Sequence, residues 1–210
     1  MTTIAIIDKY FPEITERQRN QFVEIGSLYP SWNEKINVIS RKDIDNIYPN
    51  HILHSLAIAK FLQSPVDGTR FIDLGTGGGF PGVPMAIMYP NCEFHLIDRI
   101  GKKINVARSI AEAIGLKNVT FQHGDIGECR EKFDYVVSRA VMPLNDLVKL
   151  TRKNINRGGH NRYSNGLICL KGGNLEEEIA DSNITAVEEP ISVWFNEPFF
   201  DTKSVIYVPY

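Results

Sequence analysis

Two acidic residues and a glycine-rich segment form the part of the sequence best suited to binding a small molecule. The segment FIDLGTGGGFPG, residues 71–82, holds five glycines in twelve positions. Asp73 precedes these glycines, and Asp98 ends the next apolar run. Glycine loops between a strand and a helix usually bind the phosphates of nucleotides. A carboxylate at Asp73 would repel a phosphate there, so the pattern favours a ligand with a cationic end.

The spacing of the glycines separates two classes of nucleotide-like ligand. The dinucleotide fingerprint is Gly-x-Gly-x-x-Gly with an acid about 20 residues later. Here Phe80 occupies the third glycine position of that fingerprint, and Asp98 suits a ribose in either class. S-adenosylmethionine has an ammonium, a sulfonium and no phosphate, and the acid before the loop matches it. The alternative interpretation of Asp73 is a carboxylate that caps a helix or orders the loop.

Apolar runs alternate with helical patterns from residue 70 onward, which predicts a mostly parallel sheet in an α/β fold. We expect helices over 82–90 and 102–116 between the strands. Two further strands with no helix between them, 192–200 and 204–210, predict an antiparallel C-terminal edge. The other expected strands cover 70–75, 92–99, 118–125, 133–140 and 166–173.

The N-terminal part of the sequence has a helical pattern. Apolar residues recur at spacings of three and four over 13–63, Pro30 is expected to break the first helix, and a second covers 51–62. We therefore divide the chain into a helical cap, 1–66, and a sheet domain, 67–210, which together form one compact unit.

Polar residues follow each of the first five predicted strands. Ligands of open α/β sheets bind at the carboxyl ends of the strands, so these residues are expected to meet at one edge. They are Asp73 with Gly75, Gly77 and Gly79, then Asp98, Asp125, Arg139 and Lys171.

The composition is that of a globular, cytoplasmic protein. The chain has 210 residues, 43% hydrophobic and 23% charged, with a net charge of −2. We predict neither a signal peptide nor a membrane span. The weak charge argues against tight binding to naked nucleic acid. Cys92, Cys129 and Cys169 form no metal or disulfide pattern, and we interpret them as structural.

The block DLGTGGGFPGVPMAI…LIDRIGKKINVARSIAEAIGLKNVTFQHGD…FDYVVSRAVMPLNDL…LICLKGG closely resembles the bacterial small-subunit (16S) ribosomal RNA guanine-N7 methyltransferases, formerly called glucose-inhibited division protein B. WNEKINVIS and HILHSLAI resemble upstream segments of that family, so the likeness covers about residues 20–175. It implies a Rossmann-like S-adenosylmethionine-dependent methyltransferase fold and a small-subunit RNA substrate, which the weak charge suggests is an assembled particle.

The resemblance also implies roles for single positions. Gly75, Gly77, Gly79 and Phe80 would lie at the methionine end of the cofactor, and Asp98 would bind the ribose. Ile126 and Gly127 would border the adenine. Arg139 would lie between cofactor and substrate, and Lys171 would face the RNA.

The sequence departs from the family pattern at several positions. Asp125 replaces a basic residue, and it could accept a hydrogen bond from the adenine amino group. His54 replaces an aspartate. The chain ends in VIYVPY without a basic tail, and residues 156–166 are longer than the usual turn. These departures concern RNA contacts more than cofactor binding.

Methylation at guanine N7 requires positioning more than acid–base chemistry. N7 carries a lone pair and no hydrogen, so its attack needs no general base, and alignment is the main contribution of the enzyme. We assign Arg139 and Lys171 to phosphates or to guanine O6. Phe80 is either an aromatic platform for an extruded base or a core residue that covers the loop.

Other candidate side chains have weaker patterns. His51 and His54 could be a metal pair, but without a third ligand a helix-surface or interdomain role is favoured. Basic residues near the second helix suggest a solvated face or an RNA contact: Arg99, Lys102, Lys103 and Arg108. A second basic group should open on the cofactor side of the sheet or beside it and contact RNA: Arg152, Lys153, Arg157, His160 and Arg162.

Three alternatives remain open from the sequence. They are a small-molecule methyltransferase of the same fold, a nicotinamide-dependent oxidoreductase and a non-catalytic ribosome-binding protein. Our main interpretation is a monomeric enzyme without a metal that methylates 16S ribosomal RNA in the small subunit.

Overall fold

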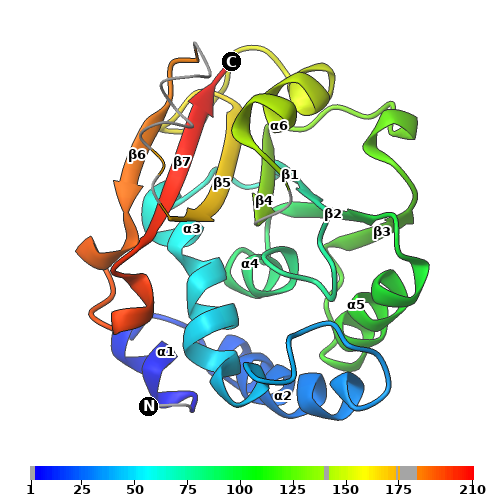
Figure 1. Ribbon diagram of the computed structural model, residues 1–210, viewed down its shortest axis with the longest axis vertical. Helices are drawn as coiled ribbons and strands as arrows, with labels where there is room; N and C mark the ends of the chain where they lie inside the picture. Colours follow the sequence, from blue (N-terminus) through cyan, green and yellow to red (C-terminus); the bar gives the residue numbers. More distant parts are fainter. Residues whose placement is uncertain (1–2, 140–141, 174, 176–183) are drawn as a thin grey trace.

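The computed structural model describes residues 3–139, 142–173, 175 and 184–210, and one β-sheet forms its centre (Figure 1). Within these residues the sheet has seven strands, in the order β3-β2-β1-β4-β5-β7-β6. Their bounds are β1 Arg70–Leu74, β2 Glu93–Asp98, β3 Val119–His123, β4 Tyr135–Arg139, β5 Gly166–Gly172, β6 Val187–Pro190 and β7 Lys203–Pro209.

The first five strands are parallel, and β7 pairs antiparallel with both β5 and β6. This confirms the expected α/β sheet with an antiparallel C-terminal edge. The chain starts in the middle at β1, builds outward to β3, and returns to add β4 on the other side of β1. The carboxyl ends of β1 and β4 therefore border the point where the strand order reverses, which is where such sheets bind ligands.

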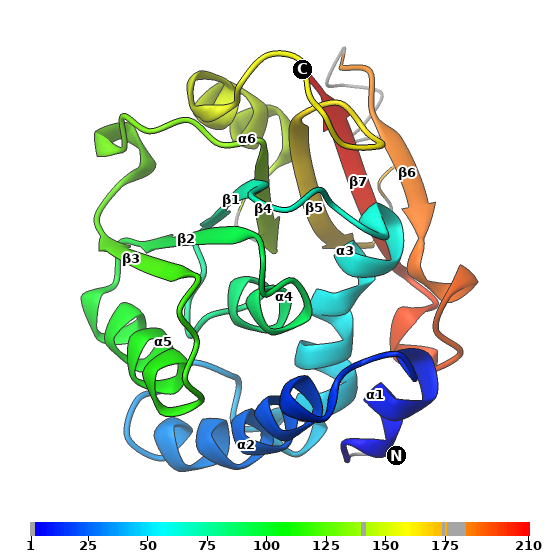
Figure 2. The same ribbon diagram turned by 180° about the vertical axis from the view of Figure 1, so that it is seen from behind.

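Helices cover both faces of the sheet. In Figures 1 and 2, α6 lies on one face, α3, α4 and α5 lie on the other, and α2 lies beyond α4 and α5. The bounds are α1 Ala5–Tyr10, α2 Glu16–Asn33, α3 His54–Leu62, α4 Gly82–Met88, α5 Gly101–Ala113 and α6 Leu144–Thr151. Short helical turns are η1 Ile44–Asn46, η2 Ile47–Leu53, η3 Ile126–Glu128, η4 Arg152–Asn154, η5 Ile191–Val193 and η6 Pro198–Phe200.

The N-terminal helices share a hydrophobic core with the sheet. Phe22, Ile25 and Tyr29 of α2 are completely buried in the same cluster as Phe71 of β1 and Tyr135 of β4. The cap therefore packs directly on the elements that carry the glycine loop.

The expected break at Pro30 is wrong, because α2 continues to Asn33. Pro30 lies in the last turn of α2, where its missing N–H removes one hydrogen bond. A capping box between Thr15 and Gln18 fixes the start of this helix. The buried side chains along its inner face stabilise the remainder.

The expected strand over 192–200 is also wrong. That segment forms η5 and η6, and the edge strand is β6 instead. Phe195 and Phe200 are completely buried in the core shared with the cap, and the backbone N–H of Asn196 donates to the hydroxyl of Tyr10. Aromatic residues favour strands in general, but here they pack inward from short turns that Asn196 and Pro198 interrupt.

Candidate active site at the carboxyl edge of the sheet

A cavity of about 530 Å³ lies at the carboxyl edge, where the strand order reverses. It brings together residues that follow β1, β2, β3 and β4. The predicted site residues in its lining are Gly75, Asp98, Asp125, Ile126 and Arg139. The remaining lining residues are Leu74, Ile97, Arg99, Ile100, Lys103, Gly124, Met142 and Leu150.

Asp73 lies beneath the glycine loop and is completely buried. Its Oδ2 accepts hydrogen bonds from the Thr76 hydroxyl at 2.5 Å and from the Gly82 N–H at 2.7 Å. These contacts order the loop and the start of α4. Oδ1 has no hydrogen-bond partner among the described residues. Burial raises the pKa of Asp73 to about 7.

Three glycines of the loop have conformations that other residues rarely adopt. Gly75 has φ +67°, Gly77 has φ +58° and Gly79 has φ +111°. A Cβ on Gly79 would also lie 2.7 Å from Val83 Cγ2 and 3.0 Å from the Tyr29 hydroxyl. The loop therefore needs glycine at position 79 for both its backbone and its packing.

Asp98 at the end of β2 joins two loops at the cavity wall. Its Oδ2 accepts from the Gly77 N–H and its Oδ1 from the Ile100 N–H, each at 2.8 Å. The carboxylate is thus fixed in position, and its second lone pairs can accept hydroxyl groups of a ligand.

Asp125 is held by the turn that follows it. Its Oδ1 accepts from the Gly127 N–H at 2.6 Å, and its Oδ2 forms an ion pair with Arg99. The Gly127 hydrogen bond, followed by Arg99, lowers the pKa of Asp125. Buried Ile126 and half-exposed Ile100 add apolar wall nearby.

Arg139 lies at the end of β4, with its guanidinium 4.9 Å from the centre of the Phe80 ring. Burial lowers the pKa of Arg139 to about 10, which leaves it charged at neutral pH. Among the described residues no hydrogen-bond acceptor contacts the guanidinium, so its donors remain for a ligand.

Phe80 is 2% exposed, and the centre of its ring lies 4.5 Å from the centre of the Tyr29 ring. Tyr29 in turn donates a hydrogen bond from its hydroxyl to the Gly78 carbonyl at 2.9 Å. Phe80 therefore lies in the core beneath the loop, and it has no exposed face on which a base could stack in this structure.

The two histidines belong to the cap, and the charge of Arg139 acts on both. His51 Nε2 lies 2.7 Å from Asp43 Oδ2, and its Nδ1 is buried with no partner among the described residues. Burial, then Arg139, lowers the pKa of His51 to about 4. The same two causes hold the pKa of His54 well below its usual value. The described residues contain no group of three potential ligands that could hold a metal ion.

Part of the basic loop before β5, at Asn161 and Arg162, lies at the opposite edge from the cavity, so for this part the expectation that it opens on the cofactor side or beside it is wrong. Lys153, in contrast, donates to the carbonyl of Gly127, a predicted cofactor residue, at 2.8 Å. A loop that precedes a parallel strand lies at the amino edge, and β5 is parallel to β4. Arg162 donates to Gln63 Oε1 at 2.5 Å, and Asn161 Oδ1 accepts from the Val66 N–H at 2.7 Å. Both partners belong to the segment before β1.

The side-chain ammonium of Lys171 lies close to the cavity rim. Its Nζ donates to the carbonyl of Met142, a lining residue, at 3.1 Å. Of the basic residues near α5, Arg99 and Lys103 line the cavity. Cys92, Cys129 and Cys169 are buried, in line with a structural role.

The apolar wall and the cap contacts of this site were not predicted from the sequence. Ile100, Met142 and Leu150 line the cavity, and a Cβ on Gly78 would lie 2.7 Å from the Cβ of Val38 in the cap. No short motif marks these residues. The one available signal was that Ile100 directly follows the end of a strand, at the edge where ligands bind.

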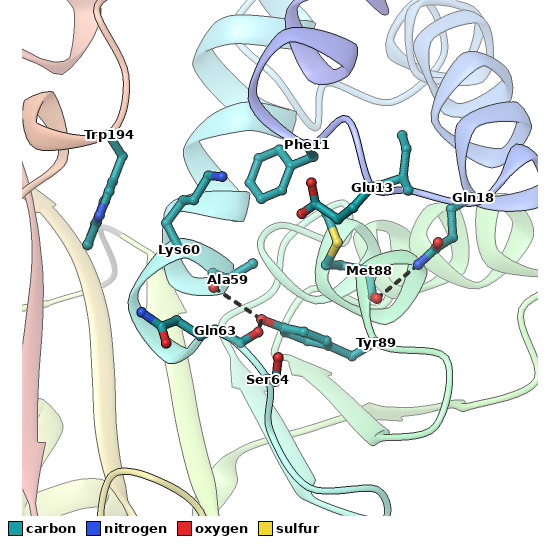
Figure 3. A pocket seen from close by; sticks show the side chains of 11 residues that line it. Phe11, Glu13, Gln18, Ala59, Lys60, Gln63, Ser64, Met88, Tyr89 and Trp194 are labelled. Atoms are coloured by element: carbon teal, nitrogen blue, oxygen red, sulfur yellow. Dashed lines mark hydrogen bonds between the residues drawn. The ribbon is translucent and has the colours of Figure 1, made fainter.

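A second cavity, of about 590 Å³, lies at the other edge of the sheet (Figure 3). It is lined by Phe11, Lys60, Trp194 and the segments that precede β1 and β2. None of the predicted site residues lines it, so we place the active site at the first cavity.

No helix in the described part of the chain is long and apolar enough to cross a membrane.

Comparison with known proteins gives consistent matches over most of the chain. A family model described as "rRNA small subunit methyltransferase G" (GidB) matches residues 16–195. A ribosomal RNA small subunit methyltransferase G of Bacteroides thetaiotaomicron is 57% identical over 97% of this chain and 98% of the relative. The protein of the same name from Cytophaga hutchinsonii is 47% identical over 98% of this chain and 99% of the relative.

Solved structures share the fold at low sequence identity. Magnesium protoporphyrin IX methyltransferase from Synechocystis PCC 6803, with bound SAM, has a TM-score of 0.61 and 15% identity, covering 99% of this chain and 97% of that one. The 16S rRNA methyltransferase RsmC of T. thermophilus has a TM-score of 0.57 and 18% identity, covering 77% and 43%. Both support the fold assignment.

Proposed function

Because the chain belongs to the GidB family, rRNA small subunit methyltransferase G, we propose that it transfers a methyl group from S-adenosylmethionine to N7 of a guanine in 16S ribosomal RNA. The enzyme class and the methyl donor follow from the family. The position on the base, the assembled small subunit as substrate, a cytoplasmic location and a monomeric state are our proposals, as is the division into a cap, 1–66, and a sheet domain, 67–210.

The observation that best supports this function is the set of groups around the carboxyl-edge cavity. Asp98 presents a fixed carboxylate suited to ribose hydroxyls. Asp125 offers an acceptor for the adenine amino group beside the apolar wall of Ile100 and Ile126. Asp73 Oδ1 is a buried acceptor without a partner among the described residues, and it suits an ammonium. S-adenosylmethionine carries ribose hydroxyls, an adenine amino group and an ammonium, which are the groups that these three carboxylates would bind.

Arg139 would act where the cofactor and the guanine meet. Its guanidinium is charged, held against Phe80 and supplied with donors that contact no acceptor among the described residues. Such a group can donate to guanine O6, next to N7, and so fix the base in line. When bound, S-adenosylmethionine supplies an electrophilic methyl group on its sulfonium. Because N7 carries no hydrogen, the chain needs to position the base and needs no side chain to remove a proton.

The test is methyl transfer to small ribosomal subunits from a strain that lacks the gene. We would incubate the protein with radiolabelled S-adenosylmethionine and these subunits and map the label in the RNA. We expect label at N7 of one guanine, lost in Arg139→Ala and retained in Arg130→Ala, an exposed arginine outside the cavity. Cofactor binding without label on the subunits would overturn the proposed substrate, and label at another guanine atom would overturn the proposed position.

A further inference from the structure

Lys203 carries a positive charge at the same edge of the sheet as Arg139. It is the first residue of β7, and it pairs with Gly172, the last residue of β5. The antiparallel direction of β7 thus brings its first residue to the carboxyl edge of the parallel strands. Lys203 lies close to Arg139 in the fold although 63 intervening residues separate them in the sequence.

The strand register places both side chains on one face of the sheet. Arg139 pairs with Leu170 on β5, and Leu170 and Gly172 point to the same face because side chains alternate along a strand. Gly172 and its antiparallel partner Lys203 also share a face. This is the face that the cap covers. Since β5 lies between β4 and β7, the two backbones are about 10 Å apart across the sheet.

The ammonium of Lys203 extends across Gly172. A Cβ on Gly172 would lie only 2.6 Å from Lys203 Nζ, so the missing side chain gives the lysine room over β5, on the side toward β4. The same Nζ lies 5.3 Å from the centre of the Phe199 ring. Phe199 is half-buried and forms a T-shaped pair with the His54 ring, with 5.4 Å between the ring centroids.

In the part of the chain that the structure describes, Lys203 forms no ion pair. Among the described residues no carboxylate lies within salt-bridge distance of Lys203 or of Arg139. Burial lowers the pKa of His54, and Arg139 and Lys203 lower it further, so this ring is held in its neutral form within the field of both cations. Two cations on one face that pair with no described carboxylate, each with an aromatic ring beside it, are typical of a surface that binds an RNA backbone.

We propose that Lys203 binds a phosphate of the ribosomal RNA strand next to the target guanine, and that Phe199 and Gly172 hold its ammonium in place for this contact. The inference rests on the proposed function. It assigns an RNA contact to the start of β7, where no motif of the sequence indicated one. It also gives the RNA a path along the carboxyl edge from Arg139 toward β7.

The test compares Lys203→Met with Lys203→Arg and with Lys117→Met, which removes an exposed lysine before β3 at the amino edge. We would measure the KM for small subunits at several salt concentrations, the Kd for S-adenosylmethionine and the melting temperature. Loss of one phosphate contact should raise the KM for subunits about three- to tenfold and reduce the salt dependence of log KM by about one charge.

We expect the Kd for S-adenosylmethionine to stay within about twofold of the wild type, Lys203→Arg to restore the KM, and Lys117→Met to have no effect. An unchanged KM and salt dependence in Lys203→Met would overturn the inference and leave the proposed function intact. A raised KM with unchanged salt dependence, or equal effects in Lys117→Met, would also overturn it. Wild-type protein that binds the methyl donor but never labels subunits would overturn both proposals.

Discussion

The guanidinium of Arg139 lies 4.9 Å from the centre of the Phe80 ring, and this stack joins the end of β4 to the glycine loop. The opposite side of the stack is the cap, because Tyr29 packs on Phe80 and donates to the Gly78 carbonyl. One buried column thus connects the N-terminal helices, the loop and the cation that faces the cavity. Through these contacts the cap and the sheet share one hydrophobic core.

Arg139→Ala should abolish methyl transfer while leaving the protein folded. The substitution removes donors that contact no other acceptor in the described part of the chain, so little internal bonding is lost. We expect the rate to fall at least about 100-fold, the loss of roughly 3 kcal/mol that removal of a charged hydrogen bond can cause. Single-turnover methylation and thermal melting check this.

Arg139→Lys is the informative companion variant. Lysine keeps the charge but lacks the planar fork that stacks on an aromatic ring and donates in two directions. It should recover only a small part of the activity. Full activity in Arg139→Lys would mean that the site needs only a charge at this position.

Asp98→Asn should weaken binding of S-adenosylmethionine about tenfold or more. Both carboxylate oxygens accept backbone N–H groups, from Gly77 and Ile100. An amide can supply only one oxygen, so its NH₂ group would face a second donor and one loop would shift. Calorimetric titration of the methyl donor measures the change. Glu112→Gln on the exposed side of α5 is the matched control, and equal affinities in the two variants would contradict the role of Asp98.

Much of this site could be predicted from sequence because it depends on local order along the chain. Asp73, Asp98 and Asp125 each follow an apolar run, and the rule that parallel strands end at one edge brings them together. The burial of Phe80 could not be predicted in the same way. It depends on Tyr29, which is 51 residues earlier, and on how the cap packs on the sheet.

The errors arise where tertiary packing overrides a local pattern. The aromatic residues over 192–200 suggest a strand, yet Phe195 and Phe200 pack into the core from short turns. The basic group from Arg152 to Arg162 was expected at or beside the cofactor side, yet only Lys153 contacts a predicted cofactor residue, whereas Arg162 lies at the amino edge because it precedes a parallel strand. Topology is the stronger guide there, and charge alone does not locate a loop.

Gly79→Ala should destabilise the protein and weaken cofactor binding together. The backbone at Gly79 has φ +111°, and a methyl group would press on Val83 and on the Tyr29 hydroxyl. Gly68→Ala is a matched control, since Gly68 has φ +81° but nothing lies within 4 Å of the place its methyl group would take. We expect about 1 kcal/mol of destabilisation at position 68 and at least about 2 kcal/mol more at position 79.

Chemical denaturation of both variants measures these differences, and titration of the methyl donor shows whether the loop still binds. Equal losses of stability at the two positions would show that backbone strain alone, without the contacts to Val83 and Tyr29, accounts for the effect.

Asp73 should make the stability of the protein depend on pH in an unusual direction. Burial raises the pKa of this carboxyl to about 7 in the folded protein, whereas in the unfolded chain it is near 3.8. Between these two values the folded state binds more protons than the unfolded state. The free energy of unfolding therefore decreases as pH rises from about 4 to about 7, and this contribution is constant above pH 7.

Asp73→Asn removes this titration while keeping an oxygen that can accept from Thr76 and Gly82. Each unit of pKa shift corresponds to about 1.4 kcal/mol, so the difference in stability between variant and wild type should change measurably between pH 5 and pH 7. Denaturation at half-unit steps of pH gives this difference free of the other titrating groups, which both proteins share. If the two stability curves run parallel, Asp73 is ionised throughout that range, and its unpartnered Oδ1 must be compensated by water or by Arg139.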